Sequence, residues 1–198
     1  MLALKPGNDI ILLLSRGNSL GFWSGKICKF FRRFNINEQI KKLAFLGLFM
    51  GLLVIATSVL RFPVPTFNLY FNLGESVIYL VALIYGGPTG ALIGGVGSAL
   101  SDLMAGYPVW APITFVIKGL EGFIVGAVAR KANPYIAVVM GAILMMTGYA
   151  AAAGILYGIG AVPVELAGDF IQVSAGAVIA LFLHSRLKNL SFNDEDKF

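Results

Sequence analysis

The sequence is poor in the residues that build disulfides and metal sites. Its 198 residues include one cysteine and one histidine, so an internal disulfide and a His/Cys metal cluster are excluded. The signatures of a phosphate-binding P-loop and of a zinc protease, HExxH, are also missing. We therefore expect no metal and no cofactor, and we expect that the protein is not an enzyme.

Charged residues are scarce as well. They make up 13% of the chain, whereas 58% of its residues are hydrophobic. A soluble domain is usually about 25% charged and about half apolar. The deviation indicates that lipid surrounds the protein, and the length fits one compact membrane domain. The net charge of +5 does not indicate nucleic-acid binding, because the cations lie in loops.

Six apolar stretches predict an all-α bundle of six transmembrane helices. The second and third are shorter than the roughly 20 residues that cross a bilayer as a helix, so a re-entrant hairpin is an alternative for this pair. Loops rich in proline and aromatic residues are expected at 63–72 and 106–112. The predicted spans are 40–60, 73–85, 89–105, 113–129, 134–157 and 163–183.

The basic residues gather on one side of these spans. Of the 15 Lys and Arg residues, eight lie within residues 1–42, two are Arg130 and Lys131, and three are Arg186, Lys188 and Lys197. Cytoplasmic loops of membrane proteins collect Lys and Arg. The pattern predicts a multi-pass protein of the plasma membrane with both termini in the cytoplasm. It leaves only Arg61 on the outer face, while Lys118 falls inside a span.

The chain outside the spans divides into two short pieces. Residues 1–39 form a basic, aromatic extension, which is either a helix lying on the membrane surface or a poorly ordered segment. Residues 40–188 form the bundle, and residues 189–198 form a polar cytoplasmic tail.

Six charged side chains remain within the spans or at their rims. A charge at mid-bilayer costs at least about 2.5–3.5 kcal/mol, so it usually faces a partner or a wet cavity. With a rise of about 1.5 Å per residue, all six fall in the outer half of the bundle. Asp102 is the predicted ion-pair partner of Lys118, and the excess acids are then protonated, hydrated or reserved for a ligand. The six are Glu75, Asp102, Lys118, Glu121, Glu165 and Asp169.

One stretch resembles a known family. Its most specific pieces are Gly87-Pro88-Thr89-Gly90-Ala91, Ser101-Asp102-Leu103-x-x-Gly106-Tyr107 and Lys118-Gly119-Leu120-Glu121-Gly122. Residues 73–129, which contain them, resemble the S components of energy-coupling factor (ECF) vitamin transporters, in the riboflavin-type or hydroxymethylpyrimidine-type branch. Compatible helices extend over roughly residues 40–188, and nothing is transferred to residues 1–39.

The resemblance implies a six-helix membrane protein that captures a vitamin on the outer face. Such proteins dock on a membrane coupling subunit that two cytoplasmic ATPases drive. A small-residue motif on helix 1 contacts the coupling subunit in the family. The matching positions here are Gly47 and Gly51, where the family more often has alanines. The glycines of the third span, in contrast, are expected to pack inside the bundle, because small residues let helix backbones approach closely.

We therefore predict an S component that binds a B vitamin or vitamin precursor. The acid excess favours an aminopyrimidine or pyridoxine-like solute, with riboflavin as the alternative, and Asp102 and Lys118 are expected to support the pocket. A stand-alone secondary carrier and, through its paired acids, an intramembrane enzyme are the competing hypotheses. The predicted substrate-binding residues are Asn68, Asn72, Trp110, Glu121, Tyr149, Asp169 and Gln172.

Overall fold

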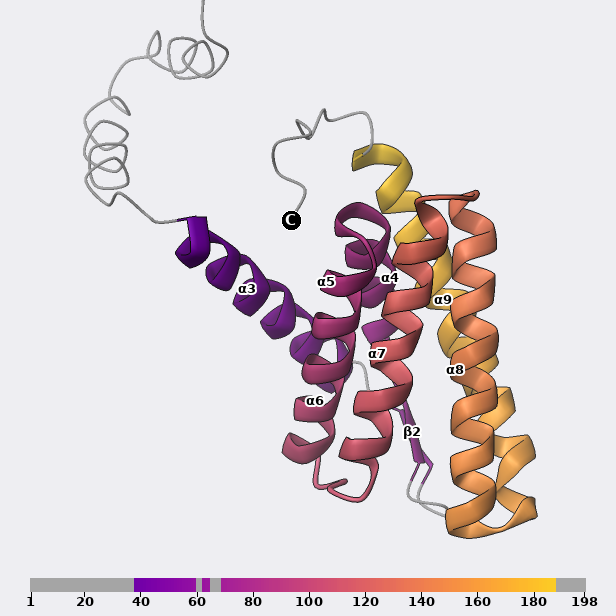
Figure 1. Ribbon diagram of the computed structural model, residues 1–198. Helices are drawn as coiled ribbons and strands as arrows, with labels where there is room; N and C mark the ends of the chain where they lie inside the picture. Colours follow the sequence, from indigo (N-terminus) through magenta and orange to yellow (C-terminus); the bar gives the residue numbers. More distant parts are fainter. Residues whose placement is uncertain (1–37, 60–61, 65–68, 188–198) are drawn as a thin grey trace, which may run out of the picture. The chain divides into compact units, whose positions relative to one another are not determined.

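The computed structural model describes residues 38–59, 62–64 and 69–187 (Figure 1). The chain divides into two units, 1–43 and 44–198, and the packing described below lies within the second. The predicted extension and tail fall outside the described residues, except that Glu38 and Gln39 open the first helix. The elements are α3 (Glu38–Val59), β1 (Phe62–Val64), β2 (Leu69–Phe71), α4 (Gly74–Tyr85), α5 (Gly87–Leu92), the π-helix η3 (Ile93–Gly97), α6 (Ser98–Met104), α7 (Trp110–Ala129), α8 (Pro134–Tyr157), the short 3₁₀ helix η4 (Ile159–Ala161) and α9 (Val162–Leu187).

Because α5, η3 and α6 follow one another without a break, the described residues form six helical rods, and the predicted all-α membrane bundle is confirmed. Local chemistry sets several of the rod ends. Gly86 and Gly158 have φ angles of +90° and +85°, a region that glycine enters without strain. The side chain of Asn133 accepts a hydrogen bond from the Tyr135 amide at 3.0 Å, and Pro134 supplies the first residue of α8.

Within the part of the chain that the structure describes, three helices are long and apolar enough to cross a membrane: Trp110–Ala129, Pro134–Tyr157 and Ile159–Leu187. In the most apolar stretch of each helix, only 44%, 33% and 33% of the residues, respectively, are buried inside the protein. The remaining apolar surface faces outward, as it does where lipid is the solvent. The protein is therefore a multi-pass membrane protein. The helix α4 has 12 residues, or about 18 Å at 1.5 Å per residue, so it does not cross a bilayer core by itself.

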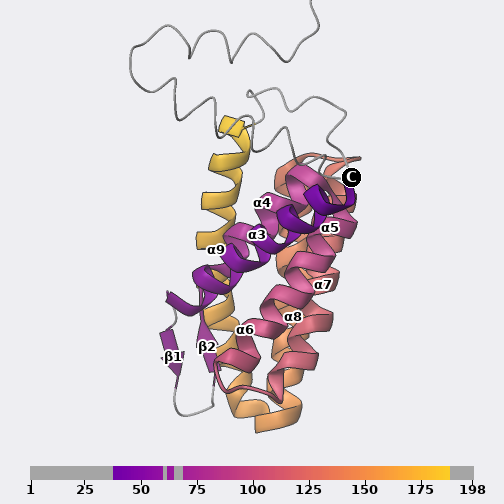
Figure 2. The same ribbon diagram turned by 90° about the vertical axis from the view of Figure 1, so that its left-hand side faces the viewer.

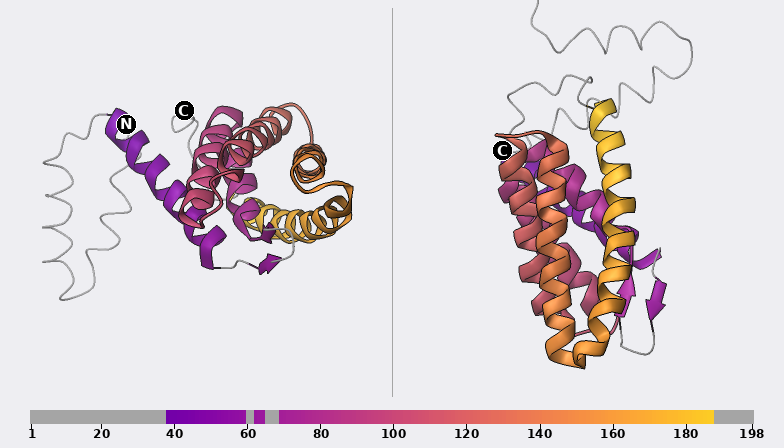
Figure 3. Two further views of the ribbon diagram at one scale, coloured as in Figure 1. Left: turned by 90° about the horizontal axis from the view of Figure 1, so that it is seen from below. Right: turned by 90° about the vertical axis from the view of Figure 1, so that its right-hand side faces the viewer.

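The bundle has two distinct ends. α7 and α9 end at the same end of the bundle (Figure 1), and Arg130 and Lys131 directly follow α7, while Arg186 lies in the last turn of α9. The first turns of these two helices, which hold Trp110 and Glu165, lie at the opposite end (Figure 1). Figure 3 shows α7, α8 and α9 running side by side between the ends. This separation agrees with the predicted charge asymmetry, while the compartment that each end faces stays a prediction.

Glycines bring the α5–η3–α6 rod into direct backbone contact with α7. A Cβ atom on Gly90 would lie 2.7 Å from the carbonyl oxygen of Gly122, and one on Gly94 would lie 2.7 Å from that of Lys118. The prediction that the glycines of the third span pack inside the bundle is confirmed. The close approach holds the α7 backbone at Lys118 against η3.

The predicted loop at 63–72 contains a short antiparallel hairpin, which Figure 2 shows with both strands in view. The strands pair Phe62 with Phe71 and Val64 with Leu69. Backbone groups near a membrane need hydrogen-bond partners, and a two-stranded ladder supplies them where a loop without pairing would not. Asn68, a predicted site residue, lies outside the described residues.

Candidate functional site

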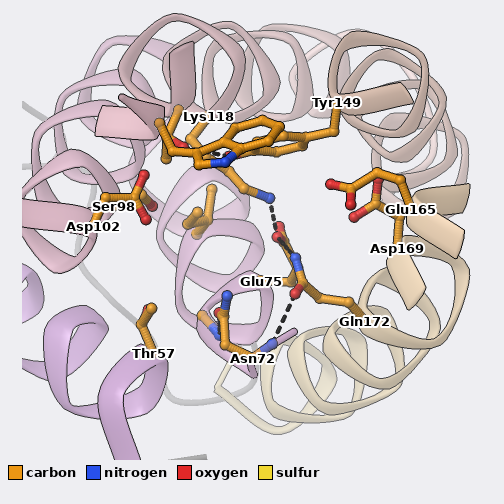
Figure 4. A pocket seen from close by; sticks show the side chains of 14 residues that line it. Thr57, Asn72, Glu75, Ser98, Asp102, Lys118, Tyr149, Glu165, Asp169 and Gln172 are labelled. Atoms are coloured by element: carbon orange, nitrogen blue, oxygen red, sulfur yellow. Dashed lines mark hydrogen bonds and ion pairs between the residues drawn. The ribbon is translucent and has the colours of Figure 1, made fainter. Parts of the chain in front are cut away.

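A cavity of about 520 Å³, including the open space at its mouth, lies among the helices of the second unit. Each of the six rods contributes at least one lining residue (Figure 4). Ligand pockets are usually concave and combine apolar walls with a few polar groups that orient the solute. The lining residues are Thr57, Asn72, Gly74, Glu75, Ile78, Ser98, Asp102, Trp110, Thr114, Lys118, Tyr149, Glu165, Asp169 and Gln172.

Helical spacing explains how the sequence places these groups on one cavity. Trp110, Thr114 and Lys118 are four residues apart and form one stripe along α7. Glu165 and Asp169 form a second stripe on α9, which Gln172 continues. The cavity is therefore walled by single faces of long helices, which fix their side chains more firmly than loops do.

The centre of the charge network is Lys118. Its ammonium donates to Glu75 and, at 3.1 Å, to Oε2 of Glu121. Tyr79 donates its hydroxyl to Oε1 of Glu121 at 2.7 Å. Glu75, Lys118 and Glu121 are all almost completely buried, so these charges stabilise one another in place of water.

This network corrects the predicted pairing of Lys118 with Asp102. The packing of α4 against α7 brings Glu75, in the first turn of α4, to the level of Lys118. Asp102 lines the cavity from α6, on the opposite side from Glu165 and Asp169 (Figure 4). The sequence identified both charges as buried, but the helix that supplies the partner depends on packing.

The amide of Gln172 joins the start of α4 to this network. Its Oε1 accepts the backbone N–H of Asn72 at 2.8 Å, and its Nε2 donates to Oε1 of Glu75 at 2.8 Å. Asn72 in turn accepts the backbone N–H of Gly74 on its side-chain oxygen at 2.7 Å. Both polar atoms of the Gln172 amide are thus engaged, which makes it a support of the site in this structure.

Aromatic rings form another wall. The rings of Trp110 and Tyr149 lie 5.9 Å apart between centroids and are inclined at 42°. The indole N–H of Trp110 donates to the hydroxyl of Tyr157 at 3.0 Å, and the hydroxyl of Tyr149 donates to Thr114 at 3.0 Å. Because these polar groups bond within the wall, the rings offer a solute mainly aromatic surface, and the ammonium of Lys118 lies 5.3 Å from the centroid of the Tyr149 ring.

The structure brings most of the predicted substrate-binding residues together. Asn72, Trp110, Tyr149, Asp169 and Gln172 all line the cavity. Glu121 is fully buried, accepts hydrogen bonds from Tyr79 and Lys118, and is not one of the lining residues. Their contact with a solute stays a prediction.

Five lining polar residues were not predicted as pocket residues. Helical spacing could have indicated two of them, since Thr114 lies four residues before Lys118 and Glu165 four before Asp169. The described residues contain no cluster of His, Cys, Asp and Glu that could hold a metal. The five are Thr57, Glu75, Ser98, Thr114 and Glu165.

The chain is similar in sequence to several proteins of archaea and bacteria. A protein of Pyrococcus woesei, described as an uncharacterized protein in a gap 3′ region, is 41% identical over 129 residues, which is 63% of this chain and 86% of that protein. The thiamine precursor transporter HmpT of Lactococcus lactis is 28% identical over 148 residues, which is 74% of this chain and 87% of HmpT. A UPF0397 protein of Streptococcus agalactiae is 33% identical over 95 residues, about half of each chain.

The sequence model of one family, described as "ECF-type riboflavin transporter, S component", matches residues 37–189. This range includes the six helical rods and every residue that lines the cavity. The resemblance predicted from the sequence is confirmed, and the chain belongs to the family of ECF transporter S components.

Proposed function

We propose that this chain captures a vitamin or vitamin precursor at the outer face of the membrane and delivers it through an ECF-type importer. The observation that carries this proposal is the polar, aromatic-walled cavity inside an otherwise apolar bundle. A buried cavity with four lining carboxyl groups is costly to maintain in a membrane, and binding of a solute gives it a purpose. Membership of a transporter family supports transport over catalysis.

The solute that these groups suit best is a flat, nitrogen-rich ring of the aminopyrimidine kind. The faces of Trp110 and Tyr149 offer stacking, and the carboxyl groups offer hydrogen-bond acceptors. The relative HmpT is described as a thiamine precursor transporter, which supports the same class. Riboflavin is the second candidate, because the matching family is described by that vitamin.

Titration with vitamins tests the capture role. The purified protein would be titrated with hydroxymethylpyrimidine, thiamine, pyridoxine and riboflavin while tryptophan fluorescence is followed. We expect one of them to cause a saturable change at sub-micromolar concentration, because Trp110 lines the cavity. Substitution of Trp110 with Phe, which keeps a ring, should remove most of that change. If no solute of the panel gives a saturable response, the capture role is wrong.

We further propose that α3 provides the contact with the membrane coupling subunit. Gly47 and Gly51 are exposed, and a Cβ atom on either would meet nothing within 4 Å. The neighbouring Leu48, Leu52 and Ile55 are 69%, 46% and 59% exposed. A stripe of small residues flanked by large ones lets a second helix approach closely.

Substitution of Gly47 and Gly51 with leucine should separate assembly from folding. We expect the double variant to melt at the wild-type temperature and to bind its solute, but to lose co-purification with the coupling and ATPase subunits. Ser174→Leu, at an exposed position of α9, is the matched control and should co-purify normally. Undiminished co-purification of the double variant would show that the partner binds elsewhere.

A further inference from the structure

Two carboxyl groups on α9 point into the cavity, and each has a buried oxygen without a hydrogen-bond partner among the described residues. Glu165 is 5% exposed and Asp169 is 2% exposed. Oε2 of Glu165 and Oδ2 of Asp169 are buried and have no hydrogen-bond partner in the part of the chain that the structure describes. Figure 4 shows both side chains directed from α9 into the cavity. Because a buried acceptor without a partner costs free energy, these atoms are poised for a group that comes from outside the chain.

The spacing of Glu165 and Asp169 allows both carboxyl groups to contact the same ligand. They are four residues apart on one helix, which places their side chains next to each other on the same face. Two adjacent carboxyl groups without a cation between them repel each other when both are ionised. A ligand with a positive charge, or with two N–H groups on one edge, would relieve both the repulsion and the missing hydrogen bonds.

Among the other lining residues, Oγ1 of Thr57 and Oε2 of Glu75 are also buried without a hydrogen-bond partner in the described part of the chain. Glu75, however, holds Lys118 and Gln172 through its other oxygen. The ammonium of Lys118 is held by Glu75 and Glu121, and both polar atoms of the Gln172 amide are used. Lys118 is also the only Lys or Arg among the lining residues that the structure gives. An anionic group such as a phosphate would therefore compete with two carboxylates for the one ammonium and would meet further carboxyl groups.

We infer that Glu165 and Asp169 form the subsite that recognises the N–H edge of an unphosphorylated, amino-substituted aromatic ring. This inference rests on the proposed capture function and assigns the recognition within it. The ring lies against Tyr149 and Trp110, and its amino group and protonated ring nitrogen donate to the carboxylates of α9. Glu75 and Glu121 keep Lys118 and do not contact the ligand edge.

The inference is tested by changing first the amino group of the ligand and then the two acids of α9. Wild-type protein would be titrated calorimetrically with hydroxymethylpyrimidine, with its analogue that carries a hydroxyl in place of the amino group, and with its phosphate monoester. We expect the analogue and the ester each to bind on the order of 100-fold more weakly, because a buried polar site left unpaired discriminates strongly. Glu165→Gln and Asp169→Asn should each weaken the amino compound about 10- to 100-fold, as expected for a hydrogen bond to a charged group.

The melting temperature of the ligand-free protein provides a second measurement. A purely structural role of the two acids would change it in the opposite direction from the one expected here. The double variant E165Q/D169N removes two unpartnered buried acids, so the ligand-free protein should melt at the same temperature as wild type or higher. A control variant, Thr147→Val, on the exposed side of α8, should change neither melting nor binding. A fall in the melting temperature of the ligand-free double variant would show that the acids hold the fold, and would overturn the subsite.

The outcomes separate the subsite from the capture function. If wild type binds the amino compound but E165Q/D169N binds it within about twofold of wild type, the subsite is wrong and the capture function stands. The same holds if the hydroxyl analogue or the phosphate ester binds as well as the amino compound, or if only riboflavin binds. If wild type binds none of the vitamins, the capture function is wrong and the subsite falls with it.

Discussion

Substitution of Lys118 with methionine should destabilise the bundle by about 3–5 kcal/mol, the range found when one partner of a buried ion pair is removed. The side chains of Lys118, Glu75 and Glu121 are 5%, 1% and 0% exposed. Methionine is an unbranched side chain that fills irregular space well, so the loss should come from the missing charge and not from a void. Equilibrium unfolding of the variant and the wild type in the same detergent measures the difference.

A variant in which the two partner acids are neutralised as well provides the control for this prediction. The triple variant K118M/E75Q/E121Q removes the two carboxylates that K118M leaves without a cation, while the amides keep hydrogen-bond acceptors for Tyr79 and Gln172. We expect it to recover most of the lost stability, because a neutral polar cluster needs no counter-charge. If K118M unfolds within about 0.5 kcal/mol of wild type, as an ordinary surface substitution does, the network does not stabilise the fold.

Helix positions could be predicted because their signals are local. The predicted fifth span, 134–157, coincides with α8, since Asn133 and Pro134 form a cap that depends only on neighbouring residues. Before α7 the sequence predicts a loop at 106–112, which includes Trp110 and Pro112. The structure begins α7 at Trp110, and a proline in the first turn of a helix removes no internal hydrogen bond.

Side-chain pairing could not be predicted, because it depends on how the helices rotate and approach one another. Lys118 and Asp102 lie at similar predicted depth, yet the structure pairs Lys118 with Glu75. That choice follows from contacts between residues far apart in the sequence, such as Gly94 against the Lys118 backbone and Gly176 against Glu75. Depth along a helix can be counted from the sequence, whereas its rotation requires the packed bundle.

The same limit explains the exchange of two acids in the predicted pocket. Glu121 lies three residues after Lys118, which put it on the predicted pocket face. In the structure Glu121 accepts the hydroxyl of Tyr79 and does not line the cavity, while Glu165, which is not among the predicted substrate-binding residues, lines it. A difference of one helical position is enough to move a side chain from the cavity wall to the core.

Alanine at Gly122 or Gly126 should cost the protein about 3 kcal/mol at each position, at the upper end of the range for overpacking. A Cβ atom on Gly122 would collide with the backbone of Gly90, and one on Gly126 with the backbone of Gly86 and Gly87. Backbone atoms in a helix or turn cannot swing aside as a side chain can, so α7 must move away from α5. Because Lys118 lies one turn before Gly122, solute affinity should fall together with stability.

Gly119 provides the matched control on the same helix. Its added Cβ would lie 3.6 Å from the carbonyl oxygen of Ala91 and 3.8 Å from Cα of Gly95, which is ordinary van der Waals contact. Gly119→Ala should therefore leave stability unchanged or raise it by up to about 1 kcal/mol through helix propensity. Melting and solute titration of both variants measure the difference. Equal losses of stability in Gly119→Ala and Gly122→Ala would show that α5 and α7 are not packed backbone to backbone.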